Sequence, residues 1–133
     1  MNSLPPSFLE RIKSQLGEDE FNSFLSAYEK PLPQSIRLNP KKKIHDFNNF
    51  DLVPWFSDGK FLTEKTQFIT DPLWHAGAYY VQEPSSMILG EIFKQIFPDE
   101  KPQRALDLCA APGGKSTLLQ GLLDKNSILV ANE

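Results

Sequence analysis

A glycine-rich turn near the carboxyl end carries the residues best suited to chemistry. Gly113 and Gly114 follow an apolar run that ends at Cys109, and a segment with helical spacing starts at Lys115. Paired glycines let a ligand approach the backbone closely, and the first amides of a helix are unpaired donors with partial positive charge. The turn therefore predicts a binding site for a polar or anionic group.

An acidic residue stands where a ribose-binding carboxylate is expected. Glu133 lies 20 residues after Gly113, at the end of a second apolar run, Ile128 to Ala131. A carboxylate at that place in nucleotide-binding folds accepts hydrogen bonds from both ribose hydroxyls. Turn and carboxylate together indicate an adenosine-containing cofactor. Because the G-x-G-x-x-G form is missing, the alternative is a structural turn and a surface glutamate.

The run from Gly114 to Thr117 also matches the end of a phosphate-binding P-loop. The complete pattern, G-x-x-x-x-G-K-[ST], needs a glycine where this chain has Cys109. Pro112 stiffens the loop and limits its wrapping around a triphosphate. The sequence therefore disfavours a nucleotide hydrolase, and Lys115 fits the start of a helix better than a phosphate clamp.

The elements around the turn form one βαβ unit. Ala105 to Cys109 is predicted as a strand, Lys115 to Leu123 as a helix and Ile128 to Ala131 as a second strand. Parallel strands joined by a helix belong to sheets covered on both faces. We therefore predict an α/β fold in which this unit begins a Rossmann-like domain, and we expect the rest of that sheet to lie beyond this sequence.

The amino-terminal part has mixed periodicity. Apolar residues at four-residue spacing predict a helix from about Ser7 to Leu16, ended by Gly17. A second helix starts at Glu18 and carries the stripe Phe21, Phe24, Leu25 and Tyr28. Alternating residues from Ser35 to Asn39 predict a strand.

Further strands and one strong helix are predicted before the turn. Two extended pieces are expected around a tight turn at Asp58-Gly59. Gly77 to Gln82 is a strand candidate ended by Pro84, and Ser85 or Ser86 is expected to cap a helix over the apolar stripe from Ile88 to Phe97. We divide the chain into an amino-terminal α+β region, residues 1–76, and the start of the cofactor-binding domain, residues 77–133.

Composition bounds the class of protein. The 133 residues are 40% hydrophobic and 23% charged, which supports a folded core, and the net charge of -3 confines any nucleic-acid binding to a local patch. The single cysteine, Cys109, excludes an internal disulfide and fits a reducing compartment, so the expected location is cytoplasmic. No membrane segment is evident, and His45 and His75 lack partners at metal-ligand spacing.

The turn and its flanks closely resemble a known cofactor motif. The run from Ala105 to Thr117, together with Ala131-Asn132-Glu133, resembles the motif of the RsmB/Nop (Nop/Sun) family of RNA cytosine-5 methyltransferases. Tyr80 to Met87 resembles the family segment that precedes this motif. The first forty or so residues look like the amino-terminal region of the RsmF-like branch.

This resemblance implies a cofactor and a set of ligands. S-adenosylmethionine would be wrapped at its methionine part by the turn, and Glu133 would hold its ribose. The residues of the turn so assigned are Cys109, Ala110, Ala111, Pro112, Gly113, Gly114 and Lys115. Asp107 could face the cofactor's amino group, or it could equally make a structural hydrogen bond toward the helix.

The family's chemistry needs a nucleophile that this sequence does not offer. Family members add a cysteine thiolate to carbon 6 of the cytosine, so that carbon 5 can take the methyl group. Cys109 lies inside the cofactor turn, whereas the family's catalytic cysteines lie in later motifs, and we expect Cys109 to be a buried, inert thiol. We therefore expect no methyl transfer from these 133 residues alone.

Contacts with RNA, and small-subunit ribosomal RNA above all, are implied by the resemblance. Arg37, Lys41, Lys42 and Lys43 form the only concentrated basic stretch, although such a stretch is more often a solvated turn. Trp55, Phe56 or Tyr79 could stack on a base if exposed, although aromatic residues in such segments more often belong to the core.

Two wider expectations complete the reading of the sequence. The alternative function is a non-catalytic RNA-binding or assembly module that keeps the glycine turn as a vestige. No obligate protein partner is evident. Because an incomplete parallel sheet leaves an open edge and uncovered apolar faces, we expect self-association or poor solubility of these residues by themselves.

Overall fold

The computed structural model describes residues 4–31, 33–42, 47, 49–63, 66–99 and 101–133. The chain forms two compact units, Met1–Leu32 and Pro33–Glu133. The boundary between these units is not the domain boundary that we predict between residues 76 and 77, which stays a prediction.

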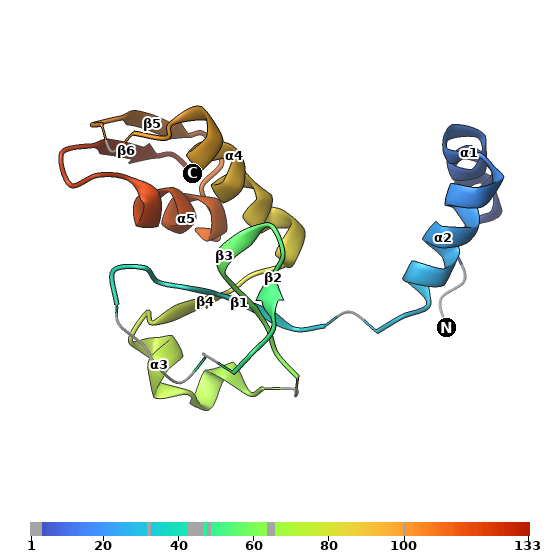
Figure 1. Cartoon of the computed structure of the whole chain (residues 1–133), viewed down its shortest axis with the longest axis horizontal. Coiled ribbons are helices and arrows are strands. Elements are labelled where there is room, and N and C mark those ends of the chain that lie inside the picture. Colours follow the sequence, from blue (N-terminus) through green and yellow to red (C-terminus); the bar gives the residue numbers. More distant parts are fainter. Residues whose placement is uncertain (1–3, 32, 43–46, 48, 64–65, 100) are drawn as a thin grey trace. The chain divides into compact units, whose positions relative to one another are not determined.

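The first unit is a pair of helices, as predicted (Figure 1). Helix α1 spans Pro6–Leu16 and helix α2 spans Glu18–Tyr28. Gly17 joins them with a positive φ of 77°, which glycine adopts without strain. The apolar stripes meet at the tilted rings of Phe8 and Phe24, whose centroids lie 6.3 Å apart.

The second unit opens with a four-stranded antiparallel sheet in the order β2-β3-β1-β4. The strands are β1, Ser35–Leu38; β2, Leu52–Val53; β3, Phe56–Phe61; and β4, Tyr79–Val81. A 3-10 turn, Phe68–Thr70, and the short helix α3, Pro72–His75, lead into β4. The predicted strands near Ser35 and Tyr79 are therefore confirmed.

Two apolar clusters hold this sheet. One consists of Ile36, Leu62, Ala78 and Tyr79, and the other of Val53, Phe56 and Met87. Ile36 and Met87 are both 0% exposed, so each cluster has a fully buried centre. Burying a side chain of this size contributes about 1.5–3 kcal/mol relative to leaving it in water.

The predicted tight turn at Asp58-Gly59 is wrong. Both residues lie inside β3, and the turn of this hairpin falls between Val53 and Phe56. Gly59 is needed for packing instead, because a Cβ atom there would lie 2.7 Å from the Met87 sulfur and 2.8 Å from the Val53 Cβ. A glycine in a strand can mark a close approach as well as a turn.

The helix that follows β4 begins with a different cap from the one predicted. A 3-10 turn, Pro84–Met87, leads into α4, Ile88–Ile96. Glu83, and neither of the two serines, caps this start by accepting hydrogen bonds from the backbone N–H groups of Ser85 and Ser86. The helix ends before Pro98, as expected.

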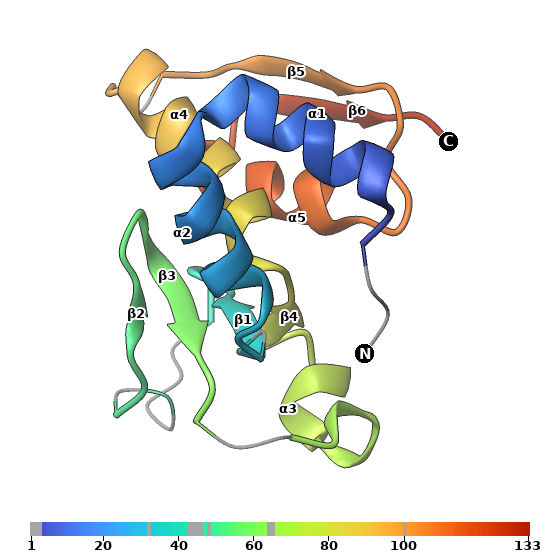
Figure 2. The same cartoon turned by 90° about the vertical axis from the view of Figure 1, so that its right-hand side faces the viewer.

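The carboxyl-terminal part is the predicted βαβ unit (Figure 2). Strand β5, Arg104–Asp107, pairs in parallel with β6, Ile128–Ala131, and helix α5, Gly114–Leu122, connects them. Helix α4 contacts both α5 and β3, and so lies between the two sheets. The α/β fold class is confirmed, and the glycine turn lies between β5 and α5.

Candidate functional site

The turn between β5 and α5 is fastened to the end of β6. The backbone N–H of Ala110 donates to Asn132 O at 2.9 Å, and the N–H of Asn132 donates to Asp107 O at 2.8 Å. The Asn132 side-chain amide also donates to Leu108 O at 3.1 Å. The ends of the two parallel strands are thereby held as one unit, at the edge where α/β sheets bind ligands.

Gly113 shapes the start of α5. Its φ of 97° lies in the left-handed region, where residues with a Cβ are strained. Its N–H donates to Ala110 O at 2.7 Å, and its carbonyl accepts from the Thr117 hydroxyl at 2.6 Å. The peptide bond between Ala111 and Pro112 is cis. The sequence pattern had located this turn correctly.

Glu133 reaches the turn. Its Oε2 accepts a hydrogen bond from the backbone N–H of Ala111 at 2.8 Å. The carboxylate that the spacing singled out thus lies directly against the loop, although 22 residues separate the two partners. The negative charge of Glu133 therefore lies against the loop that leads into α5. A polar ligand bound there could contact both the carboxylate and the loop backbone.

Asp107 makes the structural contact that was one of its two predicted roles. Its Oδ2 accepts from the Ser116 hydroxyl at 2.6 Å, and its Oδ1 accepts from the Cys109 N–H at 3.3 Å. Because Ser116 is buried in the first half of α5, this carboxylate ties the end of β5 to the helix. The loop between them is held at both ends.

Two other loop residues face solvent. Cys109 is an exposed free thiol, so the expectation of a buried thiol is wrong. The bonds that fasten the turn use the backbone of its neighbours and leave the Cys109 side chain outside. Lys115 is also exposed, and it is the second residue of α5, as its sequence position suggested.

A hollow of about 250 Å³ lies against the turn. On one side it is lined by the loop itself, and on the other by the segment that runs from β4 into the 3-10 turn. The Tyr80 hydroxyl donates to Pro112 O at 2.9 Å across this junction. The lining residues are Tyr80, Val81, Gln82, Glu83, Ser86, Cys109, Ala110, Ala111, Pro112, Gly114 and Lys115.

A buried arginine connects the antiparallel sheet to this site, and the sequence did not reveal it. Arg37 is 4% exposed. Its Nε donates to Gln82 Oε1 at 2.7 Å, and its Nη2 donates to Thr117 Oγ1 at 2.6 Å and to Gly114 O at 3.3 Å. Burial lowers the pKa of Arg37 to about 10, while Tyr80 and Asp58 act in the opposite direction.

Strand alternation explains how these residues meet. Arg37 of β1 is the register partner of Tyr80 of β4, and the Arg37 guanidinium lies 5.6 Å from the Tyr80 ring centroid. Side chains two residues apart share one face of a strand, so Gln82 extends the same face. This polar face, made by Arg37, Tyr80 and Gln82, packs on the first turn of α5.

Gly114 faces the sheet. A Cβ there would lie 3.4 Å from Gln82 Nε2 and 3.6 Å from the Tyr80 ring. Its carbonyl also accepts a hydrogen bond from Gln82 Nε2 at 3.2 Å. Distances of 3.4–3.6 Å are ordinary van der Waals contacts, so the packing of sheet and helix leaves room for a Cβ at this position.

The predicted RNA contacts divide into buried and accessible residues. Arg37 is engaged in the interior, so its assignment as a surface contact is wrong; Phe56 and Tyr79 are 3% and 4% exposed, so neither can stack on a base. Trp55 is 38% exposed, although its indole N–H donates to Pro84 O. Lys41 and Lys42 are exposed, and Lys43 lies outside the described residues.

His75 makes local contacts within its own segment. His75 contacts Ile69 O through Nε2 at 2.6 Å and packs on the Trp74 ring, and His45 lies outside the described residues. Across the part of the chain that the structure describes, no three His, Cys, Asp or Glu side chains gather as a metal site would require. No helix in that same part is long and apolar enough to cross a membrane.

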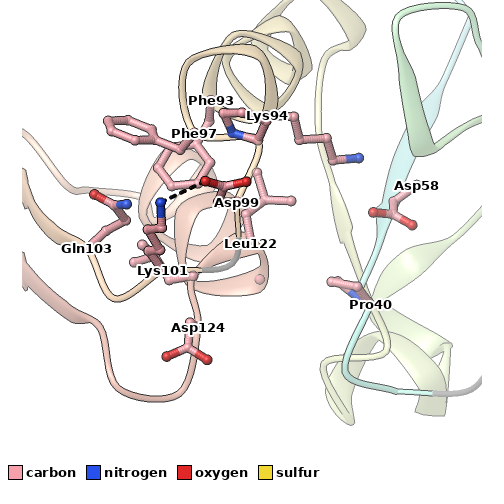
Figure 3. A pocket seen from close by; sticks show the side chains of 13 residues that line it. Pro40, Asp58, Phe93, Lys94, Phe97, Asp99, Lys101, Gln103, Leu122 and Asp124 are labelled. Atoms are coloured by element: carbon pink, nitrogen blue, oxygen red, sulfur yellow. Dashed lines mark hydrogen bonds and ion pairs between the residues drawn. The ribbon is translucent and has the colours of Figure 1, made fainter.

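A larger hollow, of about 480 Å³, lies at the other end of α5 (Figure 3). Phe93, Phe97 and Leu122 line it together with charged residues of both signs. Two of these, Lys101 and Asp99, form an exposed ion pair at 2.8 Å. Mixed charges and solvent exposure make this hollow a weaker candidate than the glycine turn.

Comparisons with known proteins agree on one kind of protein. The family model that matches residues 4–84 is described as the N-terminal domain of 16S rRNA methyltransferase RsmF. A curated protein from Shewanella denitrificans and one from Vibrio parahaemolyticus, both called ribosomal RNA small subunit methyltransferase F, are 35% and 34% identical. These alignments cover 100% and 98% of this chain but only 29% and 30% of the two relatives.

A solved structure is also similar. A methyltransferase homolog protein from Pyrococcus horikoshii is 30% identical, with a TM-score of 0.68, and the match covers 96% of this chain and 48% of that one. The present chain thus spans less than a third of the length of the curated relatives and about half of the solved one.

Proposed function

We propose a function from the premise that the chain belongs to the family of 16S rRNA methyltransferase RsmF. The protein transfers a methyl group from S-adenosylmethionine to carbon 5 of a cytosine in small-subunit ribosomal RNA. Residues 1–133 supply the amino-terminal region and the first part of the cofactor site. Such a substrate would place the protein in the cytoplasm.

The observation that carries the proposal is the contact between Glu133 and the glycine turn. The carboxylate follows β6 and accepts the Ala111 N–H in the loop that follows β5, so an acid and a cofactor loop meet beyond the ends of adjacent strands. A carboxylate so placed can accept both hydroxyls of a ribose. S-adenosylmethionine supplies both that ribose and an electrophilic methyl group.

The chain's own groups fit the rest of this cofactor. We assign its methionine part to the loop Cys109, Ala110, Ala111, Pro112, Gly113, Gly114 and Lys115, and its ribose to Glu133. The hollow of about 250 Å³ is lined by six of these seven loop residues and not by Glu133, so it offers room for the methionine part alone. The start of α5 adds partial positive charge, which suits the carboxylate of the methionine part.

We place the nucleophile for cytosine outside residues 1–133. Methylation at carbon 5 needs a thiolate that attacks carbon 6, and Cys109 is the one cysteine of this sequence. Its N–H is bonded to Asp107 within the loop that we assign to the cofactor. Residues 1–133 by themselves should therefore incorporate no labelled methyl group into RNA.

Cofactor titration of the full-length protein tests the proposal. Isothermal calorimetry should detect binding of S-adenosylmethionine, and Glu133→Ala should weaken it about 10- to 100-fold, because a hydrogen bond to a charged group contributes about 1.5–3 kcal/mol. Glu91→Gln, which changes an acid of α4 that does not line the hollow beside the turn, is the control and should leave binding unchanged. Equal affinity of Glu133→Ala and wild type would contradict the assignment.

The same titration separates the alternative function. A non-catalytic RNA-binding or assembly module would bind RNA without binding S-adenosylmethionine. RNA affinity together with no heat on cofactor addition would therefore favour the module over the enzyme.

A further inference from the structure

A third hollow, of about 320 Å³, lies between the antiparallel sheet and helix α5, and we call it the basic hollow. It lies beside the cofactor turn, since Arg37, Tyr80 and Thr117 border it and also belong to the network that holds the start of α5. Its lining residues are Arg37, Asn39, Lys41, Lys42, Gly77, Tyr79, Tyr80, Thr117, Gln120 and Gly121.

The side chains that line the basic hollow carry positive charge. Arg37, Lys41 and Lys42 are among its lining residues, and no carboxylate is among those that the structure describes. Two acids lie close to the lining: Asp71 accepts the Tyr79 hydroxyl, and Asp58 acts to raise the Arg37 pKa and so partly offsets the charge of that arginine. The charge available to a ligand is therefore mainly that of Lys41 and Lys42. These cations around one hollow would attract an anion.

The two lysines are held in place with donors to spare. Lys41 Nζ donates to Gln120 O of α5 at 2.7 Å, and Lys42 Nζ donates to Ala76 O, just after α3. An ammonium group has three N–H donors, so each lysine keeps two for another acceptor. Phosphate oxygens are suitable acceptors for such donors.

The turn that carries these lysines is itself ordered by hydrogen bonds. Asn39 N–H donates to Ala78 O at 2.9 Å, and its side chain donates to Gly77 O at 3.0 Å and accepts from the Lys41 N–H at 3.0 Å. Lys42 N–H donates to Asn39 O at 3.0 Å. A fixed backbone lowers the entropic cost of presenting both ammonium groups to a ligand.

We propose that the basic hollow binds the phosphodiester backbone of the RNA substrate through Lys41 and Lys42, with buried Arg37 adding positive charge behind them. This inference rests on the proposed function, because it takes RNA as the substrate. The position of the hollow beside the turn assigned to the methyl donor favours a strand passing toward that donor over a free phosphate ion. The site reads no sequence, because phosphate contacts position a nucleic acid without specifying its bases.

Salt dependence of RNA binding tests the proposal in the full-length protein. Fluorescence anisotropy of a short, labelled single-stranded RNA is measured over a range of potassium chloride concentrations. The double variant Lys41→Gln/Lys42→Gln should bind at least about 10-fold more weakly at low salt. The negative slope of its log affinity against log salt should become shallower by about 1.4, or about 0.7 for each lost contact.

Two matched variants test whether the effect depends on where the positive charge is removed. Lys30→Gln/Lys125→Gln removes the same charge from two other exposed lysines, and it should leave the slope within about 0.3 of wild type. Lys41→Arg/Lys42→Arg should restore both slope and affinity. A slope unchanged in Lys41→Gln/Lys42→Gln, or an equal loss in the two Gln pairs, would overturn the proposal.

Two further measurements separate the remaining outcomes. The affinity for S-adenosylmethionine should be the same in Lys41→Gln/Lys42→Gln and in wild type. If the wild-type protein binds RNA through this hollow but binds no S-adenosylmethionine, the proposed function is refuted and the RNA site is not. Inorganic phosphate and pyrophosphate are titrated as competitors. If they bind wild type and lose affinity in the Gln pair while the RNA slope is unchanged, the hollow is a free-anion site and the RNA assignment is refuted.

Discussion

Replacing Arg37 by methionine should cost about 2–4 kcal/mol of unfolding free energy. The change keeps most of the apolar stem and removes three hydrogen bonds, to Gln82, Thr117 and Gly114 O. Each hydrogen bond from a charged donor contributes about 1.5–3 kcal/mol, while the burial that lowers the Arg37 pKa to about 10 works against that gain. The buried acceptors left behind add to the loss.

Urea unfolding of residues 1–133, followed by tryptophan fluorescence, measures this cost. Both tryptophans of the chain, Trp55 and Trp74, belong to the unit that contains Arg37. Arg104→Met is the control, because Arg104 is exposed in β5, and it should change the free energy of unfolding by less than about 0.5 kcal/mol.

Two more variants test whether the cost comes from the named bonds. Arg37→Lys keeps the charge, but its single ammonium cannot replace the fork that reaches three acceptors, so it should recover less than half of the loss. Arg37→Met combined with Thr117→Val should show a coupling free energy of about 0.5–3 kcal/mol. Strict additivity, or a loss no larger than that of Arg104→Met, would refute the reasoning.

Three other changes have defined outcomes. Gly90→Ala should destabilise the chain by about 1–3 kcal/mol in urea unfolding, because its Cβ would lie 2.3 Å from the Phe56 ring, and adding Phe56→Leu should recover part of that loss. Hydrogen bonds from the side chains and backbone amides of Ser85 and Ser86 lower the pKa of Glu83. Its capping therefore stabilises the fold above the ordinary pKa of 4.5, and this stabilisation is lost as the pH falls. An NMR titration midpoint of the Glu83 carboxyl at or above 4.5 would contradict this. Tyr80→Phe removes the hydrogen bond to Pro112 O and should weaken cofactor binding about 2- to 10-fold by calorimetry, whereas an unchanged affinity would show that this bond does not support the loop.

Local patterns predicted most of the fold. The two helices before Leu32, the strands at Ser35 and Tyr79 and the βαβ unit all follow from periodicity and from glycine and proline positions. The resemblance to the RsmF-like branch, drawn from the first forty or so residues, is confirmed by the family match over residues 4–84. These features could be predicted because the periodicity of a strand or an amphipathic helix is visible within a short stretch of sequence.

The errors arose where a distant residue decides the outcome. Gly59 was assigned to a turn because its partner Met87 is 28 positions away, and only the fold shows that a side chain would not fit there. The local pattern predicts a surface cation at Arg37, because its acceptors on Gln82 and Thr117 are 45 and 80 positions away. The exposure of Cys109 likewise depends on how the loop is fastened to β6.

Strand β4 has a practical consequence for anyone dividing this protein for expression. A polypeptide that starts at Gly77 would lack β1, the strand that pairs with β4. It would also lose the hydrogen bonds that Arg37 donates to Gln82 and to Thr117 of α5. A cut between Leu32 and Pro33 follows the boundary of the compact units and leaves every one of those bonds intact. Fusion tags and split-protein reassembly should therefore use the earlier junction.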